Sequence, residues 1–118
     1  MADVLNPVDI ERRIQEIARQ IHRGVEVVTA AESAAREARR VYDTAFAHAY
    51  LDYPGAAHAK KYTAEVATAA EREAAEVAEV AYRHAERTAR ALENELRAWQ
   101  SVNASVRSMF AGERGFGG

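Results

Sequence analysis

Apolar residues recur along the first half of the chain at alternating steps of four and three, the spacing of a heptad repeat. Asn6 is a suitable N-cap, Pro7 fits the first helical position, and Asp9 complements the helix dipole. The pattern therefore predicts a helix over about residues 7–51, bulky at first and alanine-rich later. Its expected inward positions are Ile10, Ile14, Ile17, Ile21, Gly24, Val28, Ala31, Ala35, Ala38, Tyr42, Ala45 and Ala49.

The stretch "LDYPGAAH", residues 51–58, interrupts this pattern. Pro54 removes a backbone donor and disfavours helical geometry at Tyr53, and Gly55 gives the backbone further freedom. We expect a bend over residues 52–57. A second helix should follow over about residues 57–110, ending in a flexible glycine-rich tail over residues 111–118.

The second helix has a less regular apolar pattern. Steps of four are more frequent here, which favours an eleven-residue repeat and a nearly straight helix. The stripe is thin in its alanine-rich part and bulky from Leu92 onward. Its expected inward positions are Val66, Ala70, Ala74, Val77, Ala81, Ala85, Thr88, Leu92, Leu96, Trp99, Asn103, Val106 and Phe110.

Two helices of this length predict an all-α fold: one helical domain over residues 1–118, built as a long antiparallel, coiled-coil-like hairpin. Such a hairpin exposes more of its sides than it covers, so we expect it to assemble into an oligomeric bundle. If Gly24 and Asn103 break the helices, a compact four-helix bundle is the alternative. The expected self-association residues are Ile10, Ile14, Ile17, Ile21, Leu92, Leu96, Trp99 and Phe110.

Composition limits the classes of function. The 118 residues carry a net charge of −2 and no cysteine, so neither a strongly basic field nor thiol chemistry is expected. The N-terminus lacks the pattern of a signal peptide, and no run of 18 apolar residues occurs. We therefore expect a cytoplasmic protein with no membrane partner.

Catalytic and metal-binding patterns are not found. The four histidines, His22, His48, His58 and His84, share no i, i+4 spacing, and Glu79 is followed three residues later by Tyr82 instead of the histidine of a di-iron motif. The serines lack the strand–turn–helix setting of a nucleophile elbow. We predict a non-enzymatic protein with no catalytic residues, metal or cofactor.

Basic residues cluster at three places and are the candidate nucleic-acid contacts. An antiparallel hairpin with its bend at Pro54 would set residues 36–40 opposite residues 69–73, where Glu71 and Glu73 could pair with arginines. Charge pairing between helices is therefore one interpretation, and contact with a phosphate backbone is the other. The candidates are Arg36, Arg39 and Arg40, then Lys60 and Lys61, and finally Arg107 and Arg114, the last beside Phe116 in the tail.

Two segments carry a resemblance: "YDTAFAHAYLDYPG" and "AEVAYRHAERTARALENELRAWQSVNASVRSMF". They resemble a group of small phage proteins whose first helix ends in Tyr-x-x-Ala, here Tyr42 and Ala45. In those proteins the second helix closes on spaced leucines and Gln-Ser, here Leu92, Leu96, Gln100 and Ser101. The likeness covers roughly residues 35–110, and the layout is similar to that of UvsY-type recombination mediators.

This resemblance implies a phage-encoded, oligomeric accessory protein in the host cytoplasm that binds single-stranded DNA, a RecA-like recombinase, or both. The slightly negative net charge and the near absence of lysine depart from that expectation. A structural or scaffolding coiled-coil oligomer without nucleic-acid binding is the first alternative. WXG-type secreted hairpins are the second, although the bend here, Tyr53-Pro54-Gly55, has no tryptophan.

Overall fold

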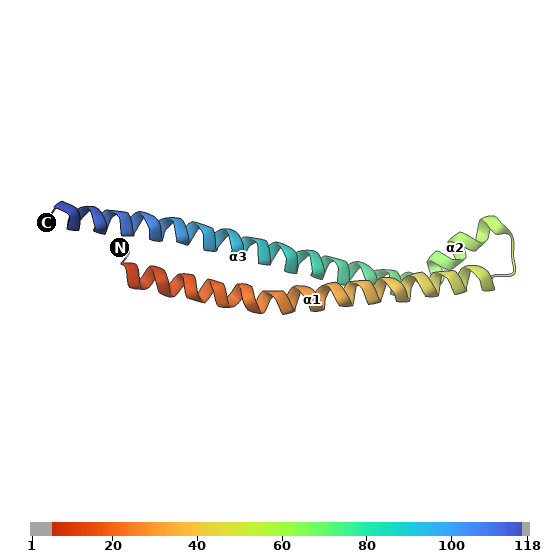
Figure 1. Cartoon of the computed structure of the whole chain (residues 1–118). Helices are drawn as coiled ribbons and strands as arrows, with labels where there is room; N and C mark the ends of the chain where they lie inside the picture. The colour runs from red at the N-terminus through yellow and green to blue at the C-terminus, as the bar shows by residue number, and fades with distance from the viewer. Residues whose placement is uncertain (1–5, 117–118) are drawn as a thin grey trace, which may run out of the picture. The chain divides into compact units, whose positions relative to one another are not determined.

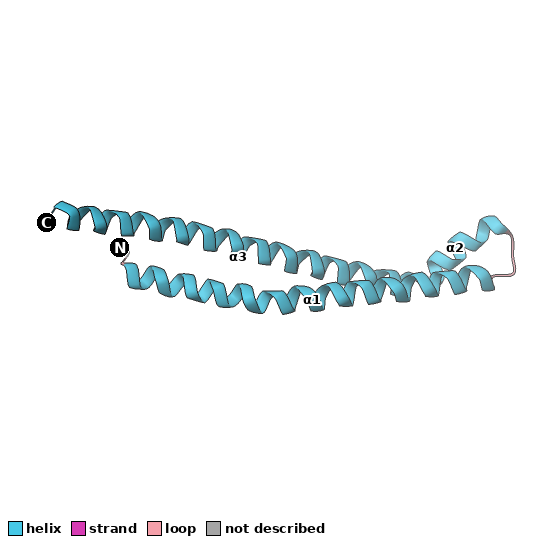
Figure 2. Ribbon diagram, in the orientation of Figure 1, coloured by secondary structure: helices cyan, strands magenta, loops and turns pink. Residues whose placement is uncertain are grey.

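The structure of the chain is a computed structural model that describes residues 6–116, with side chains described up to Gly112. Three helices make up almost all of it (Figure 1): α1 (Pro7–Asp52), α2 (Ala57–Ala67) and α3 (Ala69–Phe116). A short loop joins α1 to α2, and residues 6–116 contain no strand (Figure 2). The predicted all-α helical hairpin is confirmed.

The chain forms two compact units. Unit 1 combines the chain up to Glu26 with the chain from Arg87 onward, and unit 2 is Val27–Glu86. α1 and α3 each contribute to both units, whereas α2 belongs to unit 2 alone.

The start of α1 follows the prediction closely. The Asp9 backbone N–H donates to the Asn6 side-chain oxygen at 2.9 Å, and the Asn6 side-chain amide donates to the Asp9 carboxylate at 2.7 Å. These reciprocal bonds act like a capping box and satisfy one of the free N–H groups of the first turn. Pro7 lies at the first helical position. Its missing N–H costs no hydrogen bond there, because the first N–H groups of a helix have no partner within the helix.

The predicted heptad positions of α1 are all buried or half-buried, from Ile10 to Ala49. Gly24 lies inside the continuous helix, and Asn103 lies inside α3. Neither residue breaks its helix, so the alternative of a four-helix bundle is wrong. The cost of one glycine in a helix interior, about 1 kcal/mol, is outweighed by the packing on either side.

The second half of the chain differs from its prediction in three ways. First, the expected single helix is divided at Thr68, which is 3% exposed and has backbone angles outside the helical region. Its hydroxyl donates to the Ala64 carbonyl at 2.6 Å, and its own carbonyl accepts from the Arg72 N–H at 3.0 Å. A threonine that bonds back in this way tends to bend a helix.

Second, α3 continues to Phe116, so the prediction of a helix end at Phe110 and a flexible tail from residue 111 is wrong for residues 111–116. Ala111, Glu113 and Arg114 favour helix enough to offset Gly112. Residues 117 and 118 lie outside the described residues.

Third, the inward face of α2 and of the first half of α3 is not the predicted one. Val66, Val77, Ala70, Ala74 and Ala81 are exposed, and Val66 is 80% exposed. Apart from Glu65, Glu86, Glu95 and Val102, the buried and half-buried positions from Ala64 onward alternate by four and three, so the predicted eleven-residue repeat is wrong. They are Ala64, Thr68, Glu71, Ala75, Ala78, Tyr82, Ala85, Ala89, Leu92, Leu96, Trp99, Asn103 and Val106.

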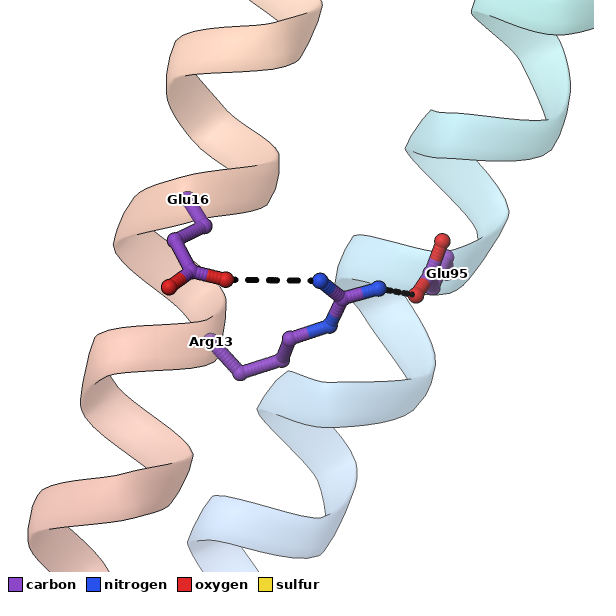
Figure 3. Close-up of polar contacts among 3 residues, drawn as sticks. All are labelled: Arg13, Glu16 and Glu95. Atoms are coloured by element: carbon purple, nitrogen blue, oxygen red, sulfur yellow. Dashed lines mark hydrogen bonds and ion pairs between the residues drawn. The ribbon is translucent and has the colours of Figure 1, made fainter.

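Unit 1 packs bulky side chains between antiparallel segments of α1 and α3. Ile10 and Ile17 have no exposed surface. Arg13 lies between two carboxylates: it donates to Glu95 of α3 at 2.7 Å and contacts Glu16 of its own helix at 3.4 Å (Figure 3). The hydrogen bond to Glu95 is the main cause that raises the pKa of Arg13.

Candidate nucleic-acid interface

Three of the predicted contact residues lie together on α1 in unit 2. The side chains of Arg36, Arg39 and Arg40 are 69%, 69% and 66% exposed. They sit within two turns of one helix because the sequence places them at adjacent helical spacings. The three guanidinium groups therefore form one exposed basic cluster in unit 2.

Each of these arginines pairs with a carboxylate of its own helix. Arg36 lies 3.4 Å from Glu32, Arg39 lies 3.2 Å from Asp43, and Arg40 pairs with Glu37. The expected pairing across helices with Glu71 and Glu73 is absent from the ion pairs of the described residues. One Glu71 carboxylate oxygen is instead buried without a hydrogen-bond partner there, and Glu73 is exposed.

The reason is a shift in register. Setting residues 36–40 opposite 69–73 would set Glu32 opposite Val77, but Glu32 accepts a 2.8 Å hydrogen bond from the Tyr82 hydroxyl. The short separate helix α2 uses chain length that a straight second helix would not. Glu71 and Glu73 therefore make no ion pair with the three arginines, which pair with carboxylates of α1 instead.

Two hollows of mixed charge adjoin the basic cluster. One, of about 380 Å³, is lined by the three arginines together with Glu32, Ala35, Glu79 and Tyr82. The other, of about 480 Å³, contains Arg39 and Arg72 beside Glu76 and Glu79. Both hollows are lined by acidic as well as basic side chains, so neither is a specific anion site by itself.

The Glu32–Tyr82 contact fixes one wall of the first hollow. The hydrogen bond to Glu32, with smaller contributions from burial and from nearby carboxylates, raises the pKa of Tyr82 to about 12. The phenol is therefore neutral at physiological pH and acts as a donor. Its role is to hold α3 against α1 beside the basic cluster.

Lys60 and Lys61 lie on α2, also in unit 2. The Lys60 ammonium is 5.7 Å from the centre of the Tyr50 ring, a cation–π distance. Lys61 is exposed. Unit 2 thus contains all five of the predicted contacts in the first two groups.

The third group, Arg107 and Arg114, is placed differently. Arg107 belongs to unit 1, is 64% exposed and donates to Glu11 at 2.6 Å. The side chain of Arg114 lies outside the described residues, as does that of Phe116. The structure therefore describes only Arg107 of this group, as one half of a cross-helix ion pair.

The predicted self-association residues differ in accessibility. Ile10 and Ile17 are fully buried within the chain, whereas Phe110 is 48% exposed. The remaining members are half-buried: Ile14, Ile21, Leu92, Leu96 and Trp99. Of the predicted set, Phe110 and the half-buried residues therefore keep surface for another molecule, and Ile10 and Ile17 do not.

An aromatic run along α1 was missed in the sequence. Tyr42 and Phe46 have ring centres 6.2 Å apart, and Phe46 and Tyr50 are stacked at 6.3 Å. Arg39 lies 5.5 Å from the Tyr42 ring. The i, i+4 spacing of the three rings could have revealed it, because that spacing places side chains on one face of a helix.

Two other kinds of site are absent from residues 6–116. No group of three or more histidine or acidic side chains is arranged to hold a metal ion. None of the helices there has the length and apolar content needed to cross a membrane.

Comparison with protein-family models, with curated proteins and with solved structures finds no match to this chain.

Proposed function

We propose that this chain is a non-enzymatic, self-associating accessory protein of phage DNA transactions that binds single-stranded DNA through unit 2. The observation that carries the proposal is the exposed cluster of Arg36, Arg39 and Arg40, which lies in the same unit as Lys60 and Lys61. These five are among the seven basic side chains of unit 2, and they are the proposed phosphate contacts of a chain whose net charge is slightly negative.

The carboxylates beside the arginines do not prevent this binding. Ion pairs between exposed side chains are worth only about 0–1 kcal/mol, so a guanidinium can exchange its carboxylate for a phosphate at little cost. Arginine also bonds phosphate through two parallel donors, which a single contact to Glu32 or Asp43 does not use. The carboxylates would limit affinity, so binding should be moderate and strongly dependent on salt.

Self-association is supported by apolar surface outside the packed seam. Val66 of α2 is 80% exposed, Val77 and Val80 of α3 are 63% and 69% exposed, and Met109 of unit 1 is 68% exposed. Exposed apolar residues on helical faces favour association with further helices. Association of several chains would place several copies of the basic cluster along one DNA strand. The proposed second partner is a RecA-like recombinase.

The test compares two triple variants of the full chain. Arg36→Gln/Arg39→Gln/Arg40→Gln neutralises the basic cluster, and Arg12→Gln/Arg19→Gln/Arg23→Gln neutralises three exposed arginines of α1 in unit 1 as the matched control. Fluorescence anisotropy with a labelled oligothymidylate, titrated at several salt concentrations, measures affinity. Losing three phosphate contacts should reduce the slope of log K against log salt by about 2 in the cluster variant only.

A wild-type chain that binds no single strand at low salt would contradict DNA binding and favour the alternative, a scaffolding coiled coil. That alternative is supported by one observation: every arginine of the cluster has a carboxylate partner. Light scattering on the same sample measures the mass in solution. An assembled but DNA-inert protein would be the scaffold, and a monomer would contradict both proposals.

A further inference from the structure

The rings of Tyr42, Phe46 and Tyr50 form a continuous aromatic ladder on one face of α1. Their centres are separated by 6.2 and 6.3 Å, which is the rise of about 6 Å expected for four residues of α-helix. All three are half-buried. Each ring therefore keeps accessible surface while its backbone is held rigidly by the helix.

A cation stands at each end of the aromatic ladder. Arg39 lies 5.5 Å from the centre of the Tyr42 ring, and Lys60 lies 5.7 Å from the centre of the Tyr50 ring. These two cations belong to the phosphate contacts proposed above. A polyanion that reached both would pass along the rings between them.

The far half of the ladder borders an apolar hollow. Phe46, Ala47, Tyr50 and Leu51 line an open space of about 370 Å³, and Leu51 is 72% exposed. Neither a phosphate nor a sugar would gain from such a surface. A flat, weakly polar base would, because every base has a face that stacks on an aromatic ring.

We propose that the aromatic ladder is a base-stacking platform that makes unit 2 select unpaired, base-bearing strands over duplex DNA and over polyanions without bases. This inference rests on the proposed function, and it names the feature of the ligand that the site recognises. The ring spacing is roughly twice the 3.4 Å step of a strand in a duplex, so a stretched single strand could follow the rings. The bases of a duplex are already stacked on one another and cannot stack on the rings.

The ladder also has a simpler structural role, since Lys60 packs over Tyr50 and so joins α2 to α1. The two roles are separated by measuring binding to three labelled probes of equal length. These are an oligothymidylate, an abasic phosphodiester strand and a duplex. The abasic strand has the same charge as the oligothymidylate but offers nothing to stack, and this comparison needs no variant.

Wild-type chain should bind the oligothymidylate about tenfold more tightly than the abasic strand. Phe46→Leu/Tyr50→Leu should lose that preference while keeping its affinity for the abasic strand, because its charges are unchanged. Tyr62→Leu removes a ring that is 65% exposed on α2 outside the ladder, and it should keep the preference. Far-UV circular dichroism checks that each variant remains helical.

The outcomes separate the inference from the proposed function. Equal wild-type binding to the oligothymidylate and the abasic strand would overturn the platform and leave DNA binding intact. The platform would also be overturned if Phe46→Leu/Tyr50→Leu kept the preference for the oligothymidylate over the abasic strand. The same holds if Tyr62→Leu lost this preference to the same extent. A wild-type chain that binds none of the three probes would overturn the proposed function itself.

Discussion

Unit 1 and unit 2 use the same spacing of inward positions with side chains of different size. In unit 1 the seam holds Ile10, Ile17, Leu92, Leu96 and Trp99, and the two isoleucines are fully buried. In unit 2 the buried apolar residues are alanines: Ala35, Ala64, Ala75 and Ala85. Burial is worth about 25 cal/mol per Å² of apolar area, so unit 1 gains much more per seam position than unit 2.

The two units also differ in how they use charge. In unit 1, Arg13 and Arg107 bond to carboxylates on the opposite helix, at 2.7 and 2.6 Å. In unit 2 the arginines of α1 pair within their own helix and remain about two-thirds exposed. Two arginines of unit 1 thus join its helices, whereas the three arginines of the basic cluster in unit 2 make no ion pair with another helix. A thin core and an accessible cationic surface occur in the same unit.

The largest expected effect on the free energy of unfolding comes from a substitution in the seam of unit 1. Ile17→Ala should lower the free energy of unfolding by about 2–5 kcal/mol, because a fully buried side chain leaves a cavity. Val8→Ala on the same helix, where the valine is 63% exposed, should change it by less than about 0.5 kcal/mol. Urea unfolding followed by circular dichroism at fixed protein concentration measures both. Equal losses would mean that unit 1 has no bulky core.

The alanine seam should resist enlargement. Ala75→Leu should cost about 1–3 kcal/mol, because Ala75 is 7% exposed and the added carbons would force the helices apart. Ala74→Leu, one residue earlier and exposed, should be neutral within about 0.5 kcal/mol. The same unfolding measurement applies. If Ala74→Leu proved the costlier change, the register predicted from the sequence would be correct and the observed one wrong.

The smallest effect at neutral pH concerns the cross-helix bond of unit 2. The folded-state pKa of Tyr82, about 12, lies above its ordinary value of 10.0. Stability from the Tyr82–Glu32 bond should therefore be fully present below about pH 10 and be lost as pH rises through about 12. The difference in unfolding free energy between wild type and Tyr82→Phe should be constant up to pH 10 and shrink above it. A difference that stays constant to pH 12 would contradict this.

The sequence predicted the first helix well and the second one poorly, for a physical reason. In α1 the isoleucines stand out from polar neighbours, so only one face can be the buried one. Around residues 64–81, alanines and valines occupy several faces, and the larger valines favoured the wrong stripe. Val66 and Val77 are exposed, while the seam takes Ala75, Ala78 and three polar residues, Thr68, Glu71 and Tyr82.

The candidate site was predicted only in part. Its arginines and lysines were identified from their clustering, but their partners were not, because partner choice depends on register. A break at a single threonine and a separate α2 moved that register, and neither follows from helix propensity alone. The aromatic ladder was missed although its spacing is visible, since Phe46 and Tyr50 lie just outside the heptad positions.

The sequence by itself determined the all-helical class, the capped start of α1, the heptad spacing of α1 and the bend, because these depend on neighbours within a few residues. Only the tertiary structure decided which alanines face inward, where the second helix divides, and whether an arginine pairs along its helix or across it. Those outcomes depend on contacts between residues far apart in the chain, such as Glu32 and Tyr82, which are set by close packing of small side chains.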